Sequence, residues 1–207
     1  MTEHAPKIRL LIADDEHLIR GALEALLGLE PDIDVIAGTD NGLSAVALAA
    51  ELAPDLCLLD LEMPGADGIE AAERIVLANP AARIIIVTRH ARPGVLRRAL
   101  TAKVAGFVPK STPAGELANV IRQVAAGKRY IDPEIAAAAL TAERCPLTAR
   151  ELDVLRATRV TSSVQEIAET LFLSQGTVRN YLSQAMTKLG SRNRQDAADH
   201  AWQQGWI

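Results

Sequence analysis

The stretch LLIADDEHLIR, residues 10–20, carries an apolar run that stops at two adjacent aspartates, Asp14 and Asp15. It is the first of five short apolar runs, and stretches with helical spacing separate them. The runs are Ile8–Ala13, Ile33–Thr39, Leu56–Leu59, Ile84–Thr88 and Gly106–Val108. They are nearly continuous rather than alternating, which is typical of strands covered on both faces. Strand and helix alternating five times predict a doubly wound, five-stranded parallel α/β sheet.

The helices between these runs are expected near residues 16–28, 41–52, 67–79, 93–102 and 113–126. Two of them have clear start signals. Asp67 and Glu70 have the spacing of a capping box, in which two side chains bond the free N–H groups of a first helical turn. Thr112 is a cap residue before Pro113, which is expected at the first helical position.

After Gly127 the pattern changes, and no strand-like run remains. Residues 127–146 are expected to be a linker with a short alanine-rich helix at Ala136–Ala142. Cap signals beyond it predict four helices near 148–158, 164–171, 174–189 and 194–204. The signals are Thr148 with Glu151, Ser163 with Glu166, Asn193 with Asp196, and Ser174. The expected domains are thus an α/β domain at 1–126 and an all-α domain at 147–207.

The composition is that of a soluble globular protein, with 49% hydrophobic and 23% charged residues among 207. No apolar run approaches the ~20 residues that cross a bilayer, and the polar start MTEHAPK is unlike a signal peptide. We therefore expect a cytoplasmic protein without membrane insertion, with Cys57 and Cys145 as free thiols. The net charge is −4, yet residues 174–194 hold four bases and no acid. Such a patch fits either a nucleic-acid surface or a solvated helix face.

Polar residues gather where the predicted strands end. Asp14 and Asp15 follow the first strand and Asp60 the third, while Thr88 ends the fourth and Lys110 follows the fifth. Ligands of open parallel sheets bind at this edge, so these side chains are expected to converge. Three carboxylates with one lysine require another cation, and oxygen ligands favour Mg²⁺. Each aspartate by itself is equally compatible with a simple helix cap.

The motifs LLIADDEH, LLDLEMPGADGIEA, IIIVT and GFVPKS occur in order and together resemble the receiver domain of two-component response regulators. The resemblance implies that Asp60 accepts a phosphoryl group from the phosphohistidine of a sensor histidine kinase. It implies Mg²⁺ bound by Asp15, Asp60 and the main-chain carbonyl of Glu62, with Asp14 acting through water. Phosphoryl oxygens would contact Thr88 and Lys110.

The same resemblance makes Phe107 the aromatic switch residue, although a plain core role is equally compatible with its sequence position. Glu62 and His90 stand where this family tunes the lifetime of the aspartyl phosphate. One departure is Ser111, which follows Lys110 where many receivers have a proline. The protein is expected to be no enzyme beyond slow self-dephosphorylation.

The C-terminal segment, with LTARE, EIA, S-x-x-TV and KLG-x-x-N-R in order, resembles the helix-turn-helix domain of NarL/FixJ (LuxR-type) regulators. The resemblance implies a homodimer, formed on phosphorylation, that binds double-stranded DNA at a palindromic or direct-repeat site. Base edges would be read by Arg179, Asn180 and Ser183. Contacts to the DNA sugar-phosphate backbone are expected from Gln175, Thr177, Lys188, Arg192 and Arg194. The opposite helix face, with Val178, Leu182, Ala185 and Leu189, is expected in the core.

The motifs ARPG, ELANVIRQVAAGKR and VRNY resemble the subgroup that contains the desaturase regulator DesR, which points to lipid or membrane-related target genes. Two alternatives remain at this stage. One is a phosphatase of the haloacid dehalogenase type, whose DxD motif differs from the adjacent pair found here. The other is a regulator that binds DNA without phosphorylation, against which the set of Asp15, Asp60, Thr88 and Lys110 argues.

Overall fold

The computed structural model describes residues 7–89, 92–140 and 143–207. Their contacts divide the chain into two compact units. Most of the residues up to Ala137 form the first unit, and the residues from Ala138 to Ile207 form most of the second. Each unit is described by itself below.

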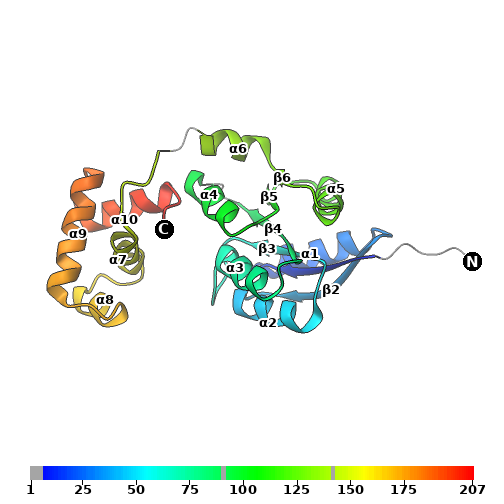
Figure 1. Cartoon of the computed structure of the whole chain (residues 1–207), viewed down its shortest axis with the longest axis horizontal. Helices are drawn as coiled ribbons and strands as arrows, with labels where there is room; N and C mark the ends of the chain where they lie inside the picture. Colours follow the sequence, from blue (N-terminus) through cyan, green and yellow to red (C-terminus); the bar gives the residue numbers. More distant parts are fainter. Residues whose placement is uncertain (1–6, 90–91, 141–142) are drawn as a thin grey trace, which may run out of the picture. The chain divides into compact units, whose positions relative to one another are not determined.

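The first unit is built on one parallel sheet with helices around it (Figure 1). Its strands lie in the order β2-β1-β3-β4-β5-β6, and every neighbouring pair is parallel. The strands are β1 (Ile8–Ala13), β2 (Ile33–Thr39), β3 (Leu56–Asp60), β4 (Arg83–Thr88), β5 (Gly106–Pro109) and β6 (Tyr130–Ile131). The α/β fold class predicted from the sequence is confirmed.

The prediction of five strands is wrong, because β6 adds a sixth. The Tyr130 N–H donates to the Ala105 carbonyl at 3.0 Å, and the Asp132 N–H donates to the Phe107 carbonyl at 2.9 Å. Two residues are too few to show the alternation of apolar and polar side chains that indicates a strand, and the polar stretch around them is typical of a loop. Part of the stretch 127–146 therefore belongs to the sheet.

Six helices accompany this sheet: α1 (His17–Gly28), α2 (Gly42–Leu52), α3 (Gly68–Ala78), α4 (Pro93–Thr101), α5 (Ala114–Ala125) and α6 (Pro133–Leu140). The predicted cap at Asp67 is confirmed, since its carboxylate accepts the N–H groups of Ile69 and Glu70 at 2.9 and 2.8 Å.

The cap prediction at Thr112 is wrong. Pro113 has an extended ψ of 144° and is itself the N-cap residue of α5, so the helix begins one residue later. The predicted alanine-rich helix is α6, and residues 141–142 lie outside the described residues.

Both faces of the sheet are buried, as a doubly wound fold requires. On one face, Leu10, Leu56 and Ile85 pack in a core with Leu27 of α1 and with α5. Alternate strand residues point to the opposite face. These include Leu11, Cys57, Ile84, Ile86 and Phe107, and all are buried. Burial raises the pKa of the Cys57 thiol to about 12, and both cysteines are free.

The second unit contains four helices, α7 (Ala149–Val160), α8 (Val164–Thr170), α9 (Gln175–Leu189) and α10 (Arg194–Gln203). Their predicted starts are confirmed by side-chain caps at Thr148, Ser163, Ser174 and Asn193. Only the first of these is a complete capping box in the described residues, with the Thr148 N–H donating to Glu151 at 2.7 Å. A core that includes Trp206 joins the helices. No helix in the described ranges is long and apolar enough to cross a bilayer.

Candidate functional site

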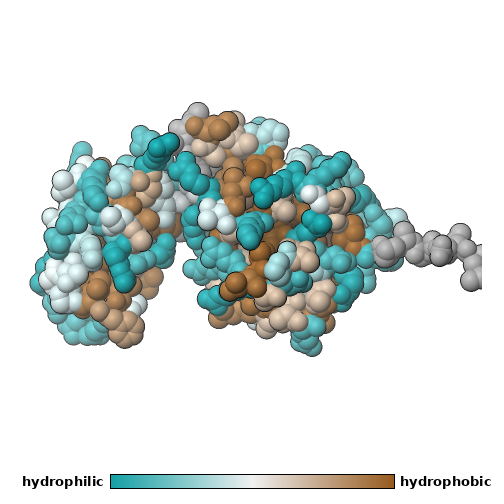
Figure 2. Space-filling view, in the orientation of Figure 1, coloured by the Kyte–Doolittle hydropathy of each residue, from teal (hydrophilic) through white to brown (hydrophobic). Residues whose placement is uncertain are grey.

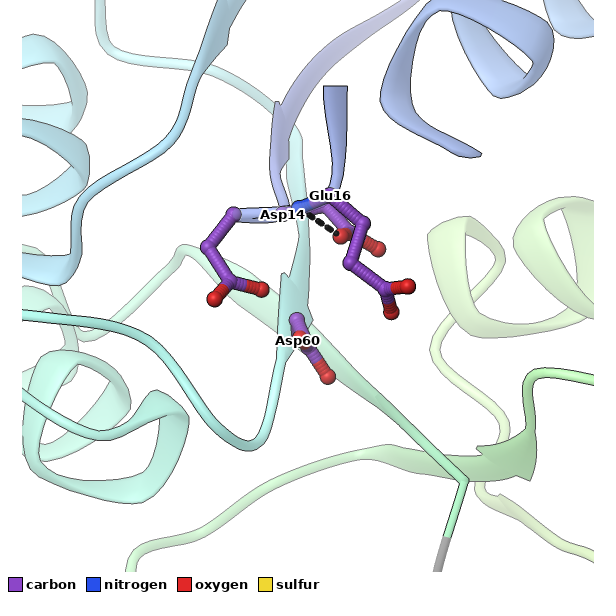
Figure 3. Close-up of side chains that lie close together, drawn as sticks. Asp14, Glu16 and Asp60 are labelled. Carbon is purple, nitrogen blue, oxygen red and sulfur yellow. Dashed lines mark hydrogen bonds between the residues drawn. The ribbon is translucent and has the colours of Figure 1, made fainter. Parts of the chain in front are cut away.

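Four acidic side chains gather at the carboxyl ends of β1 and β3. Asp14 and Asp15 directly follow β1, Glu16 comes next, and Asp60 is the last residue of β3. One carboxylate oxygen from each lies within 4.8 Å of the others. Asp14 and Asp60 are only 2% and 5% exposed. Figure 3 shows Asp60 beside the loop that carries Asp14 and Glu16. The structure thus brings together the acids that the sequence singled out, and adds Glu16.

Lys110 is the cation at the centre of this cluster. Its Nζ lies 2.9 Å from Asp14 Oδ2, 2.9 Å from Asp60 Oδ2 and 2.8 Å from Glu16 Oε1. The Lys110 N–H donates to the Thr88 carbonyl at 2.8 Å, which fixes the lysine at the end of β4. Burial opposes the charge of Lys110, but the three carboxylates outweigh it and raise the pKa of the ammonium. The lysine therefore stays protonated in the cleft.

The pKa values of Asp60 and Glu16 are shifted in opposite directions. Burial, helped by the charge of Asp14, raises the pKa of Asp60 to about 6, although Lys110 and the Glu62 N–H act in the opposite direction. The hydrogen bond from Lys110 lowers the pKa of Glu16. Buried carboxylates outnumber the buried ammonium, so the site has a surplus of negative charge. An oxygen-only donor set with that surplus fits a hard divalent cation such as Mg²⁺.

A cleft of about 270 Å³ opens beside these residues. It is lined by Asp15, Glu16, Asp60, Glu62, Thr88, Arg89 and Lys110. Thr88 is buried at the end of β4, and Phe107 is buried within β5. His90, which the sequence placed next to this site, lies outside the described residues. The cleft is large enough to admit a phosphoryl-sized group next to Asp60.

Sequence reasoning missed Glu16 and Arg89 as members of this site. The Glu16 carboxylate pairs with both Lys110 and Arg89. Glu16 directly follows the aspartate pair, and Arg89 directly follows Thr88. Adjacency to strand-end residues was the available signal. The ion pair itself joins residues 73 positions apart, so only the fold reveals it.

The second candidate surface is the outer face of α9. Gln175, Arg179, Asn180 and Ser183 are exposed, and Thr177 is partly exposed. The prediction that the other face enters the core is confirmed: Val178, Leu182 and Ala185 are buried, and Leu189 packs partly buried against them. Hydrophilic and neutral residues cover most of α9 in Figure 2. Arg179, Arg192 and Arg194 also line a groove of about 440 Å³ with apolar side chains at Val164, Leu182 and Met186.

Lys188, expected on DNA, has a partner inside the protein. Its Nζ lies 2.8 and 2.7 Å from the two carboxylate oxygens of Glu151, which is 1% exposed. Burial acts to raise the pKa of Glu151, but Lys188 and Thr148 outweigh burial and lower it. This arrangement gives Lys188 a structural role between α7 and α9.

Two family comparisons agree with this division of the chain. The family of response regulator receiver domains matches residues 10–122, and the luxR family of bacterial regulatory proteins matches residues 145–201. The chain is a response regulator of the LuxR family. As a receiver joined to a LuxR-type DNA-binding domain, it is a transcription regulator. This finding removes the phosphatase alternative.

Relatives of this response regulator match along nearly its whole length. The transcriptional regulatory protein DesR of Bacillus subtilis is 42% identical over 97% of this chain and 99% of its own. The uncharacterized regulator YvfU of the same species is 40% identical over 97% and 100%. A solved LuxR-family response regulator from Aurantimonas is 33% identical, with a TM-score of 0.62 over 65% of this chain and 96% of its own. The RcsB–DNA complex, 24% identical with a TM-score of 0.65 over 95% and 98%, shows the same fold.

Proposed function

We propose that a sensor histidine kinase phosphorylates this response regulator on Asp60, and that the aspartyl phosphate promotes dimerisation and DNA binding. One observation carries the proposal: a buried carboxylate at a strand end, 2.9 Å from a buried lysine, lines a cleft with a surplus of negative charge. Such a charge imbalance destabilises the fold unless a cation compensates it. A site with that imbalance is therefore better explained by chemistry than by stability.

The proposed chemistry is a nucleophilic displacement at phosphorus. A carboxylate oxygen of Asp60 attacks the phosphoryl group of the kinase phosphohistidine, so that a P–O bond forms as the P–N bond breaks. The leaving imidazole takes up a proton. Lys110, already 2.9 Å from Asp60, offsets charge on the phosphoryl oxygens, and the Thr88 hydroxyl at the end of β4 is their second contact.

The residues present fit a Mg²⁺ site. We assign its ligands to the carboxylates of Asp15 and Asp60 and the main-chain carbonyl of Glu62, with Asp14 one water away. Asp14 suits the outer position because, unlike Asp15 and Asp60, it is not among the residues that line the cleft, and its carboxylate accepts the Glu16 N–H at 2.9 Å. When bound, the ion supplies positive charge next to the transferring phosphoryl group.

The output we propose is a homodimer that reads DNA through α9. Through its contacts with Thr88 and Lys110, the phosphoryl group favours one of two conformations of β4 and β5, with Phe107 as the switch residue. In α9, Arg179, Asn180 and Ser183 face base edges. Backbone phosphates contact Gln175, Thr177, Arg192 and Arg194, with Lys188 the weakest candidate because Glu151 engages it. Two-fold symmetry implies a palindromic site with half-sites about one DNA turn apart, whereas a direct-repeat site requires both helix-turn-helix domains to bind in the same orientation. The resemblance of the motifs ARPG, ELANVIRQVAAGKR and VRNY to the desaturase-regulator subgroup extends the proposal to lipid or membrane-related genes as targets.

The test of phosphorylation uses the full chain and a labelled kinase or small phosphodonor. Asp60→Asn should abolish incorporation of label, because Asp60 is the buried, lysine-paired carboxylate that lines the cleft, whereas the equally buried Asp14 is not among the lining residues. Asp34→Asn, an exposed acid on β2, is the matched control and should be labelled like the wild type. Wild-type labelling of Asp60→Asn would overturn the proposal.

The test of DNA reading uses the phosphorylated full chain and sites found by genome-wide mapping of bound DNA. Arg179→Ala should weaken binding to such a site by about 1–3 kcal/mol and relax its sequence preference. Labelling on Asp60 should stay unchanged in this variant. An unchanged preference among sites, measured by fluorescence anisotropy, would contradict the base-reading role.

A further inference from the structure

One carboxylate in the cleft is shared by two cations. Glu16 Oε1 lies 2.8 Å from Lys110 Nζ, and Glu16 Oε2 pairs with a terminal nitrogen of Arg89. All three residues line the same cleft as Asp60. Lys110 already has a function in the proposed phosphorylation, whereas Arg89 and Glu16 have none. Arg89 therefore brings a second positive charge to the cleft that needs a chemical explanation.

The backbone around Glu16 shows that its carboxylate is directed to these cations. Glu16 is the N-cap residue of α1, yet its side chain makes no cap hydrogen bond. Its own N–H donates to Asp14 Oδ1 at 2.9 Å, drawn as the dashed line in Figure 3, which holds the residue at the end of β1. A glutamate at this position has free N–H groups of the helix to bond. It bonds Lys110 and Arg89 instead.

The charges in the cleft explain this choice. An aspartyl phosphate carries up to two negative charges in place of the one on the Asp60 carboxylate, so phosphorylation adds to the surplus that the site already holds. Lys110 is the one buried cation among the described residues that line the cleft, and it is shared by three carboxylates. A guanidinium at the rim matches phosphoryl oxygens better than an ammonium does, because its planar fork donates two parallel hydrogen bonds.

We propose that Arg89 is a further phosphoryl-binding residue and that Glu16 holds it at the cleft until the phosphoryl group arrives. This inference rests on the proposed phosphorylation of Asp60. In the unphosphorylated protein, the Glu16 carboxylate takes the place of the anion for both cations. On phosphorylation, Arg89 passes from Glu16 to the phosphoryl oxygens. Glu16 thus competes with the phosphoryl group, and Arg89 favours it.

The competing explanation is an ordinary surface ion pair. The Arg89 side chain is 55% exposed, and exposed pairs contribute little to stability. That explanation predicts that Arg89 does not change anion binding at Asp60, and that any effect of Glu16 comes from its contact with Lys110 alone. The two explanations therefore differ in a measurable affinity rather than in the stability of the fold.

The experiment titrates the full chain, in the presence of Mg²⁺, with beryllofluoride, an analogue of the phosphoryl group on aspartate. Bound beryllofluoride is detected directly by fluorine NMR. Arg89→Gln should weaken binding about three- to tenfold, because one charged hydrogen-bonding partner is lost. Glu16→Gln should tighten it by a similar factor, and Arg89→Lys should bind between Arg89→Gln and the wild type. The matched control is Arg97→Gln, an exposed arginine of α4 outside the cleft, which should bind like the wild type.

Two results would overturn the inference: wild-type affinity in Arg89→Gln, or weakened affinity in Glu16→Gln. The thermal midpoint without beryllofluoride is recorded for each variant. It should change little, because the Arg89 side chain is 55% exposed and Lys110 keeps Asp14 and Asp60 as partners when Glu16 is changed. Asp60→Asn in the same series tests the proposed function separately. Loss of bound signal in Asp60→Asn with an unaffected Arg89→Gln rejects only this inference, whereas retained signal in Asp60→Asn rejects the phosphorylation site itself.

Discussion

Both units bury a carboxylate against a lysine, but the charges balance in only one of them. In the helical unit, Glu151 meets Lys188 with both carboxylate oxygens and also caps α7 through Thr148. In the sheet unit, Lys110 is divided among Asp14, Glu16 and Asp60. The lysine–carboxylate distances are similar in the two units, at 2.9 Å for Lys110 and Asp60 and 2.7 Å for Lys188 and Glu151. They differ in how many negative charges each lysine must offset.

This difference in charge balance shows in the pKa values of the two buried acids. Lys188 and Thr148 outweigh burial and lower the pKa of Glu151, whereas burial raises the pKa of Asp60 to about 6. In a balanced pair each charge compensates the other, so that removing one partner alone is destabilising. An unbalanced cluster costs stability and persists where a ligand completes it. A structural ion pair and a candidate reactive site thus differ in the number of carboxylates that each lysine faces, and in the burial of the lysine, which is 6% exposed at Lys110 and 37% exposed at Lys188.

The largest expected effect comes from breaking the balanced pair. Glu151→Gln removes the charge that Lys188 faces and weakens the reciprocal cap. Because the Lys188 side chain is 37% exposed, water screens part of this loss, so the free energy of unfolding of the helical unit should fall by about 2 kcal/mol. Hydrogen exchange of the full chain, resolved by peptide, measures each unit separately. Glu169→Gln, an exposed acid of α8, is the control and should stay within about 0.5 kcal/mol. A comparable loss in both variants would contradict the structural role of Glu151.

The opposite sign is expected at Asp60. Because its pKa is raised to about 6, the folded state binds a proton more tightly than the unfolded chain between roughly pH 4 and 6. The charged carboxylate therefore destabilises the sheet unit above pH 6, and this penalty is relieved as the pH falls. In Mg²⁺-free buffer at pH 7.5, Asp60→Asn should unfold with about 1–2 kcal/mol more free energy than the wild type.

The stability difference between wild type and Asp60→Asn should also shrink from pH 7.5 to pH 5, since the wild-type carboxyl takes up its proton in this interval. Urea unfolding at the two pH values, followed by a probe in the sheet unit, gives the difference. A difference independent of pH would show that Asp60 is not strained by its charge.

A smaller effect is expected from the metal. Mg²⁺ at ten times its dissociation constant should stabilise the sheet unit by about 1.4 kcal/mol and leave the helical unit unchanged. Asp15→Asn should remove this stabilisation, because Asp15 is an assigned ligand, while Glu151→Gln should retain it. Equal stabilisation of both units by Mg²⁺ would mean that the ion binds nonspecifically to this acidic chain.

Much of this arrangement was predictable from sequence because it depends on local signals. Strand ends located Asp14, Asp60, Thr88 and Lys110 at one sheet edge, since parallel strands all end there. Side-chain caps located the starts of α3 and α7–α10, because a cap and its acceptor N–H groups lie within one turn. Helical spacing separated the buried and exposed faces of α9 in the same way.

What escaped prediction depends on contacts between distant residues. Lys188 reads as a DNA contact in a basic stretch, yet its partner Glu151 lies 37 positions earlier. The bridge from Glu16 to Arg89 and Lys110 joins three separate loops. Strand β6 is two residues long and is defined only by its pairing with β5. Periodicity cannot reveal such features, since none of them repeats along the chain.

Strand β6 also covers β5 at one of the two edges of the sheet, the other edge being β2. Without it, β5 would be the edge strand, and the carbonyls of Ala105 and Phe107 would be left unpaired, ready to accept a strand from another molecule. With it, the edge at this end of the sheet is two residues long, too short a template for strand addition. A receiver fragment that ends at residue 126 would therefore expose β5 as an edge strand prone to intermolecular pairing, while one that continues through α6 keeps β6 paired with β5.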